Sequence, residues 1–191
     1  MELKTKKRKV QTLLGFQLII LLVFSNDIFP QKINWMSFQE ALEVQKEEPK
    51  KIFMDVYTDW CAPCKIMDAL TFGHKDVAEF VNEHFYAVKF NAEGNDEFVY
   101  LEKPYSNPYF NPNRKKNKMH EFAQFLGIQG FPTVVFFNEK GEPIFPVTGL
   151  LNPTQLELYL KFINTDQHQS ITTKEGMEEF IESFVPQFVS E

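Results

Sequence analysis

The chain has 191 residues, 43% of them hydrophobic and 24% charged, which fits one well-cored globular domain with appendages and excludes two domains of ordinary size. Its 21 phenylalanines predict an aromatic-rich core. The formal net charge is −6 and no basic stripe runs along the body of the chain, so we expect no nucleic-acid binding.

The N-terminus carries a targeting pattern, in which five basic residues within positions 4–9 precede an apolar run over 13–24. This run is shorter than the roughly 20 apolar residues that span a bilayer, so residues 1–30 are predicted to be a secretory signal peptide. Residues 25–30 lack a small-x-small cleavage site. An N-terminal membrane anchor over residues 10–24 is therefore the main alternative, and a disordered cytosolic tail is the third. We expect an exported protein, periplasmic or envelope-associated.

The first half of the body predicts alternating helices and strands. Ser37 and Glu40 have the spacing of a capping box, and Pro49 and Gly73 are placed to end helices. The predicted elements are an edge strand at 33–35, helices at 37–48, from Cys61 to about Phe72 and at 75–84, and strands at 51–57 and 85–91.

Residues 92–117 differ from the rest of the chain. Prolines at 104, 108 and 112 interrupt a series of aromatic residues, and no periodicity survives. We predict a long loop insertion, because irregular loops of this length are usually functional or disordered.

Beyond the insertion, the predicted elements are a helix at 118–126, a hairpin of strands at 133–138 and 143–148, and a helix from Asn152 to about 164. The order of elements predicts an α/β domain over residues 31–164, with a mixed sheet covered by helices on both faces. Residues 165–191 are predicted to be a C-terminal extension with one amphipathic helix, capped by Thr172. We expect this helix to pack on its own domain; docking to a partner is the alternative.

The only two cysteines, Cys61 and Cys64, stand three residues apart where a helix is predicted to begin. Residues at i and i+3 share a helix face, which brings the Cα atoms within the roughly 4.4 to 6.8 Å that a disulfide needs. The ring that such a bond closes is minimal, so the bond is expected to form and break easily. A permanent structural disulfide is the alternative.

The sequence supports a metal site or a cofactor site at this cysteine pair less well than a disulfide. A zinc site needs four ligands, and the chain has no second cysteine pair. A c-type haem site needs histidine after the second cysteine, where this chain has Lys65. We therefore expect no metal and no cofactor. The histidines are scattered along the sequence, at His74, His84, His120 and His168.

Two separated motifs carry a family resemblance. The segment Met54-Asp55-Val56-Tyr57-Thr58-Asp59-Trp60-Cys61-Ala62-Pro63-Cys64-Lys65 resembles the active-site segment of the thioredoxin family, and Gly127-Ile128-Gln129-Gly130-Phe131-Pro132-Thr133 resembles that family's second signature. The resemblance runs from about residue 35 to 163. It implies a thioredoxin-like α/β fold, with a central mixed sheet of four to five strands and helices on both faces. It also implies a thiol–disulfide oxidoreductase that acts on protein disulfides.

Cys61 is the predicted attacking thiol, because the N–H groups and the dipole at a helix N-terminus favour a thiolate. Cys64, one turn further in, is expected to be the less exposed resolving thiol. Trp60 is expected to shield the sulfur of Cys61; an ordinary packed aromatic is the alternative.

Asp55 is the one carboxylate in an apolar strand, and burial is expected to raise its pKa and make it a proton acceptor for Cys64. By resemblance, Lys89 is the lysine that partners this acid. The alternatives are a solvated Asp55 at a strand end and an ordinary surface lysine. Pro132 matches the family's cis-proline, beside which the backbone of Phe131 is expected to pair with an extended substrate segment. A trans proline that starts a strand is the alternative.

Ala62 and Tyr57 depart from the residues that are common in the family and leave the redox potential open. Pro63 resembles the residue found in reducing members of the family, so we expect a reductase of protein disulfides. We also expect a monomer that draws electrons from a membrane donor. The 92–117 loop starts at the active-site edge of the sheet and is expected to restrict or select substrates. The alternative function is a non-catalytic docking module that binds a partner through this loop.

Overall fold

The computed structural model of the chain describes residues 32–188. The predicted signal peptide or anchor, including residues 10–24, lies outside the described residues. Among the residues that are described, no helix is both long enough and apolar enough to cross a membrane.

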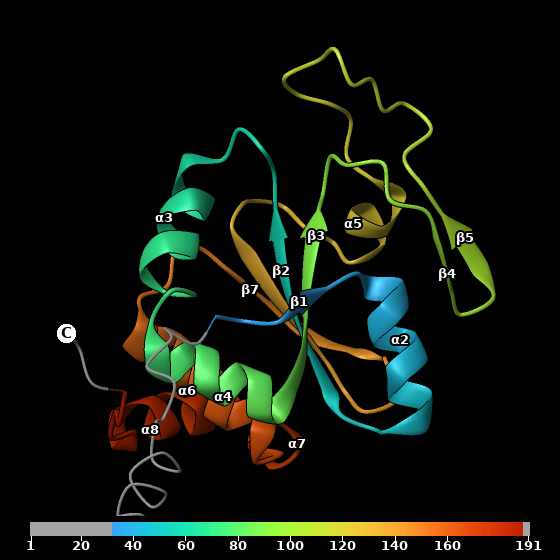
Figure 1. Cartoon of the computed structure of the whole chain (residues 1–191). Coiled ribbons are helices and arrows are strands. Elements are labelled where there is room, and N and C mark those ends of the chain that lie inside the picture. Colours follow the sequence, from blue (N-terminus) through green and yellow to red (C-terminus); the bar gives the residue numbers. More distant parts are fainter. Residues whose placement is uncertain (1–31, 189–191) are drawn as a thin grey trace, which may run out of the picture. The chain divides into compact units, whose positions relative to one another are not determined.

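A five-stranded sheet forms the centre of the domain, in the order β1-β3-β2-β6-β7 (Figure 1). β3 runs parallel to β1 and β2, whereas β6 is antiparallel to β2 and β7 antiparallel to β6. The predicted mixed sheet of four to five strands is therefore confirmed. The strands are β1 (Trp35–Met36), β2 (Lys51–Tyr57), β3 (Phe85–Asn91), β6 (Thr133–Phe137) and β7 (Pro143–Thr148).

Helices cover both faces of the sheet, as predicted (Figure 1). One face packs against α3 (Ala62–Leu70), α4 (Lys75–His84) and α6 (Pro153–Asn164). The other face packs against α2 (Phe38–Glu47) and α5 (Glu121–Phe125). Each face has its own apolar cluster, and Phe53 and Phe136 belong to the first while Ile52 and Phe137 belong to the second.

Local sequence explains where the main helices begin. Ser37 accepts a hydrogen bond from the backbone N–H of Glu40, and the carboxylate of Glu40 accepts one from the backbone N–H of Ser37, which completes the predicted capping box. Asn152 and Gln155 form the same reciprocal pair at the start of α6, with Pro153 in the first turn.

The insertion at 92–117 contains regular structure that the sequence did not reveal. A small antiparallel hairpin joins β4 (Phe98–Tyr100) to β5 (Lys103–Tyr105). Its aromatic side chains are buried against Phe38 and Phe122 and extend the core on that side of the sheet. The prolines obscured the alternation, because the strands are only three residues long.

Hydrogen bonds tie both ends of the insertion together. The side-chain amide nitrogen of Asn107, which is buried, lies 3.0 Å from the carbonyl oxygen of Gly94 and 2.9 Å from that of Lys118. The backbone N–H of His120 donates to the carbonyl of Ala92 at 2.8 Å. The imidazole of His120 caps α5 by accepting from Phe122, so the predicted helix at 118–126 begins only at residue 121.

The C-terminal extension has two helices, α7 (Gln167–Ser170) and α8 (Lys174–Ser183). Thr173 caps α8 by accepting from the backbone of Gly176, so the predicted cap at Thr172 is off by one residue. Phe180 of α8 packs against the cluster formed by α3, α4 and α6. The carboxylate of Glu157, fully buried in α6, accepts from the backbone of Gln187 and Phe188.

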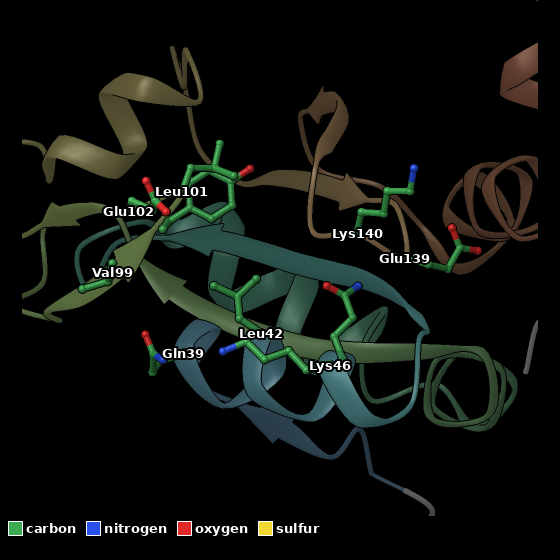
Figure 2. A pocket seen from close by; sticks show the side chains of 10 residues that line it. Gln39, Leu42, Lys46, Val99, Leu101, Glu102, Glu139 and Lys140 are labelled. Carbon is green, nitrogen blue, oxygen red and sulfur yellow. The ribbon is translucent and has the colours of Figure 1, made fainter.

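A surface pocket of ≈ 490 Å³ lies between α2, the β4–β5 hairpin and the turn that follows β6 (Figure 2). Lys46 of α2 and Lys140 of the turn line it, together with Val99 and Leu101 of the hairpin. None of the predicted site residues lines this pocket. The chemistry of the cysteine pair therefore belongs elsewhere on the domain.

Candidate active site

The two cysteines stand at the N-terminus of α3, four residues after β2 ends. Cys61 is the N-cap residue, and its Sγ accepts a hydrogen bond from the backbone N–H of Cys64 at 3.1 Å. The sulfurs are joined in a disulfide, with the Cα atoms 5.3 Å apart. The proximity that the one-turn spacing predicted is therefore confirmed.

The exposure predicted for the two cysteines is wrong. Cys61 is only 2% exposed and Cys64 only 3%, so the first is not the more accessible of the two. The sequence placed Cys61 at an open helix end, but residues from elsewhere in the chain surround Trp60 beside it. In the oxidised protein, neither cysteine presents more than a few per cent of its surface to solvent.

Three neighbours hold the indole of Trp60. Its Nε1–H donates to the carboxylate of Glu93 at 2.9 Å, and its ring meets that of Phe131 edge-on with the centroids 6.0 Å apart. The ammonium of Lys116 lies 3.9 Å from the centre of the indole ring. The same carboxylate oxygen of Glu93 accepts from the backbone N–H of Asn117 at 2.7 Å. Glu93 thus ties Trp60, the residue before Cys61, to the far end of the insertion.

Asp55 lies on the face of β2 that α3 covers, because residues at alternate positions of a strand share a face and Phe53 packs there. Its side chain is buried, and one carboxylate oxygen, Oδ1, has no hydrogen-bond partner. Lys89 of β3 lies directly across the parallel pair, with its ammonium 3.6 Å from Oδ2 of Asp55. The same ammonium contacts the carboxylate of Asp68 in α3 more closely.

Burial raises the pKa of Asp55 to about 7, and the nearby Asp68 carboxylate also raises it, while the Lys89 ammonium works in the opposite direction. Asp68 stands four residues after Cys64, so the two share a face of α3. Asp55 therefore lies on the side of the sheet that α3 covers, and its carboxyl group keeps its proton up to a pH of about 7.

The peptide bond between Phe131 and Pro132 is cis, in agreement with the resemblance. Pro132 directly precedes β6, whose first residue Thr133 pairs with Val56 near the end of β2. The contact between Phe131 and Trp60 brings this turn to the cysteines. Trp60 and Phe131, which are 71 positions apart in the sequence, thus meet at one end of the sheet.

Sequence reasoning missed Asp68, Glu93 and Lys116. The spacing of Asp68 from Cys64 was a usable signal, because i and i+4 lie on one helix face. Glu93 stands two residues after β3 ends, at the end of the sheet where the parallel strand β2 also ends, so its position could have been inferred from the sequence. The position of Lys116 depends on how the insertion folds, and no sequence pattern predicts it. Within the described part of the chain, no group of three or more acidic, histidine or cysteine side chains is arranged to hold a metal ion.

A mixed sheet with a Cys-x-x-Cys disulfide at the start of the helix after its central strand is the arrangement of a thioredoxin-like domain. The chain belongs to the family described as thioredoxin-like domain, whose profile matches residues 38–164.

Among curated proteins, the chain is similar to the thiol:disulfide interchange protein DsbD of Vibrio cholerae, with 27% identity over 116 residues, which are 61% of this chain and 16% of that protein. It is also similar to the DsbD protein of Actinobacillus pleuropneumoniae, with 27% identity over 132 residues, 66% of this chain and 18% of that protein. The chain therefore spans less than a fifth of the length of either relative.

Solved structures show the same fold. A thioredoxin-fold protein from Helicobacter pylori superposes with a TM-score of 0.55 at 22% identity, covering 70% of this chain and 81% of the other. A putative disulphide-isomerase from Bacteroides thetaiotaomicron superposes with a TM-score of 0.50 at 25% identity, covering 72% and 97%.

We predict that Asp55 makes the stability of the oxidised protein fall as pH rises. Its folded pKa of about 7 lies above the unfolded value of 3.8, so the folded state binds the extra proton between these values. The stabilisation is complete below the unfolded pKa and is lost as pH rises through about 7. The loss is at most about 4 kcal/mol for a pKa that rises from 3.8 to about 7.

Urea unfolding at pH 4 to 8 measures this effect. The variant Asp55→Asn is expected to be less sensitive to pH across that range than the wild type, whereas the control Asp59→Asn, at an exposed carboxylate, keeps the wild-type slope. Equal slopes in the wild type and Asp55→Asn would contradict the assignment.

We also predict that Glu93 limits access to Cys61 in the reduced protein. Glu93→Ala removes the acceptor for both Trp60 and Asn117, and two such bonds contribute about 1 to 3 kcal/mol. The rate of alkylation of Cys61 by iodoacetamide is expected to rise about tenfold. Glu97→Ala, an exposed glutamate on the same loop, serves as the control and should not change the rate. If Glu93→Ala reacts no faster than this control, Glu93 does not limit access to Cys61.

Proposed function

We propose that this chain is an exported reductase of protein disulfides that acts in the cell envelope through Cys61 and Cys64. The observation that carries the proposal is the Cys61–Cys64 disulfide at the N-terminus of α3, beside Trp60 and the Phe131–Pro132 turn. The oxidised pair is the product of one turnover, and the reduced pair is the reagent.

In the first step, the thiolate of Cys61 attacks one sulfur of the substrate disulfide. The substrate S–S bond breaks, a bond forms between Cys61 and the attacked sulfur, and the other substrate sulfur leaves as a thiolate and takes a proton. The helix N-terminus favours the thiolate of Cys61, because the N–H of Cys64 already points at its Sγ.

In the second step, Cys64 loses its proton and attacks the Sγ of Cys61. The mixed disulfide breaks, the Cys61–Cys64 bond forms, and the second substrate sulfur leaves and is protonated. The substrate has then gained two electrons and two protons, which the enzyme pair has lost. We assign the proton of Cys64 to Asp55, since a carboxylate with a pKa of about 7 accepts and releases a proton near neutral pH.

Lys89 positions this acid. Its ammonium lies between Asp55 and Asp68 and is also 5.0 Å from the ring centre of Tyr57. Because it is partly exposed while Asp55 is not, Lys89 connects the buried carboxylate to the surface. Its charge opposes the rise in the pKa of Asp55 and keeps that pKa in a usable range.

Substrate contacts are assigned to Trp60, Phe131 and Pro132. Phe131, which is partly exposed, lies beside Trp60 and precedes the cis bond to Pro132, and its backbone is proposed to pair with an extended substrate segment. The protein is proposed to act as a monomer on folded or unfolded protein disulfides.

The proposed direction of exchange and the proposed location of the protein rest on the sequence. Pro63 in the Cys-Ala-Pro-Cys motif resembles reducing members of the family, and the N-terminal basic and apolar pattern supports export. An exported reductase needs a source of electrons across the membrane, so we propose a membrane protein as the donor. The similarity to proteins named thiol:disulfide interchange protein is in keeping with this proposal.

Mixed-disulfide trapping tests the proposed roles. The variant Cys64→Ser cannot resolve the first step, so it is expected to accumulate disulfide-linked complexes with substrate proteins through Cys61. These complexes are detected on non-reducing gels and disappear on addition of a reductant. The matched variant Cys61→Ser is expected to trap at least tenfold less, because the remaining thiol lacks the helix-end position.

The opposite ranking of the two variants would reverse the assigned roles. Full biological activity of Cys61→Ser would instead favour the docking-module function.

A further inference from the structure

Four basic residues lie within five positions beside the active site: Arg114, Lys115, Lys116 and Lys118, here called the basic run. All four are exposed, and none forms an ion pair with any described residue. The remainder of the body is acidic. Residues 32–188 contain 15 basic and 23 acidic side chains, so this concentration of positive charge runs against the balance of the domain.

The basic run is joined to the catalytic cysteines through Trp60. Lys116 lies over the indole ring at 3.9 Å, and the backbone of the next residue, Asn117, shares the Glu93 carboxylate with the indole N–H. Trp60 directly precedes Cys61 in the sequence. A partner that presents its disulfide to Cys61 therefore meets the basic run at the same time.

The backbone around the basic run is held in place. The side chain of Asn117 accepts from the backbone N–H of Asn111 at 2.8 Å, and the N–H of Arg114 donates to the carbonyl of Asn111 at 3.0 Å. Lys118 lies 4.0 Å from the ring centre of Tyr109, and its carbonyl accepts from Asn107. Charges on a fixed loop lose less conformational entropy on binding than charges on a free one.

No described carboxylate forms an ion pair with the basic run. The carboxylate of Glu93 accepts hydrogen bonds from Trp60 and Asn117, and that of Asp59 accepts one from Asn91 at 3.2 Å. Positive charges that lack an ion-pair partner beside a reactive site steer and bind segments of the opposite charge.

We propose that the basic run selects protein disulfides flanked by acidic residues, an inference that rests on the proposed exchange reaction. Carboxylates beside the substrate disulfide pair with Arg114 and Lys115 and compete with the indole of Trp60 for Lys116. Recognition of an acidic flank thereby acts on the contacts of Trp60, the residue next to Cys61. The insertion confers this selectivity on a domain that is otherwise acidic and repels acidic partners.

Peptide disulfides of matched sequence test the proposal on the full-length reduced protein. Three peptides carry the same disulfide, flanked by four aspartates, four serines or four lysines. At roughly 20 mM ionic strength we expect kcat/KM for the acidic peptide to exceed that for the basic peptide about tenfold or more, and the difference to shrink below about threefold at roughly 0.5 M.

Substitution of the charged residues identifies which of them cause the preference for the acidic peptide. Arg114→Ser with Lys115→Ser is expected to bring the acidic-to-basic ratio of kcat/KM down to about one to three, and Arg114→Glu with Lys115→Glu to invert it. The matched control is Lys46→Ser with Lys140→Ser, which removes two exposed charges from the pocket of Figure 2 and is expected to keep the wild-type ratio.

The outcomes separate this inference from the proposed function. If the wild type exchanges none of the three peptides, the proposed function fails. If it exchanges the serine peptide but shows no preference for the acidic one, only the selectivity proposal is overturned. Loss of preference in the control as well would assign the effect to overall charge. Binding to anionic lipid vesicles that requires Arg114 and Lys115, without peptide preference, would assign the basic run to a membrane surface.

Discussion

Strand β2 is buried on both faces, and this constraint fixes where the groups of the site lie. Apolar core covers both faces of the strand, and the alternation of its side chains places Asp55 beside Phe53, on the face that α3 covers. Because β2 is the central strand, Lys89 on its parallel neighbour is held directly opposite Asp55. The strand then ends, and within four residues Cys61 caps α3. A carboxylate with a pKa near neutrality and a reactive cysteine pair are thus products of the same strand.

The insertion contacts the residue beside the cysteine pair. Both cysteines are almost fully buried, and the proposed exchange requires one of them to meet another protein's sulfur. Trp60, which directly precedes Cys61, is held by a few polar and aromatic contacts, among them a hydrogen bond to the carboxylate of Glu93. Contacts of this kind contribute a few kcal/mol together, so we expect Trp60 to move without unfolding of the sheet.

The sequence was sufficient for the fold, the order of the main elements outside the insertion and the cysteine pair, because periodicity and motif spacing are local properties. The unusual Asp55 within an apolar strand was also visible, although its partner Lys89 came only from the family resemblance. The contacts of Trp60 with Glu93 and Lys116 were not predictable, since both residues approach through the folded insertion. The β4–β5 hairpin was hidden because short strands with prolines carry no periodic signal. Sequence patterns therefore did not predict how irregular segments pack against distant parts of the chain.

The central claim is that Cys61 and Cys64 cycle reversibly between a disulfide and two thiols. Equilibration of the full-length protein with a series of reduced and oxidised glutathione, followed by acid quenching and mass measurement of the alkylated thiols, tests it most directly. The account predicts one reversible two-electron transition, with a midpoint closer to roughly −270 mV than to roughly −120 mV. A pair that stays oxidised across the whole series, or that reduces only when the protein unfolds, would contradict it.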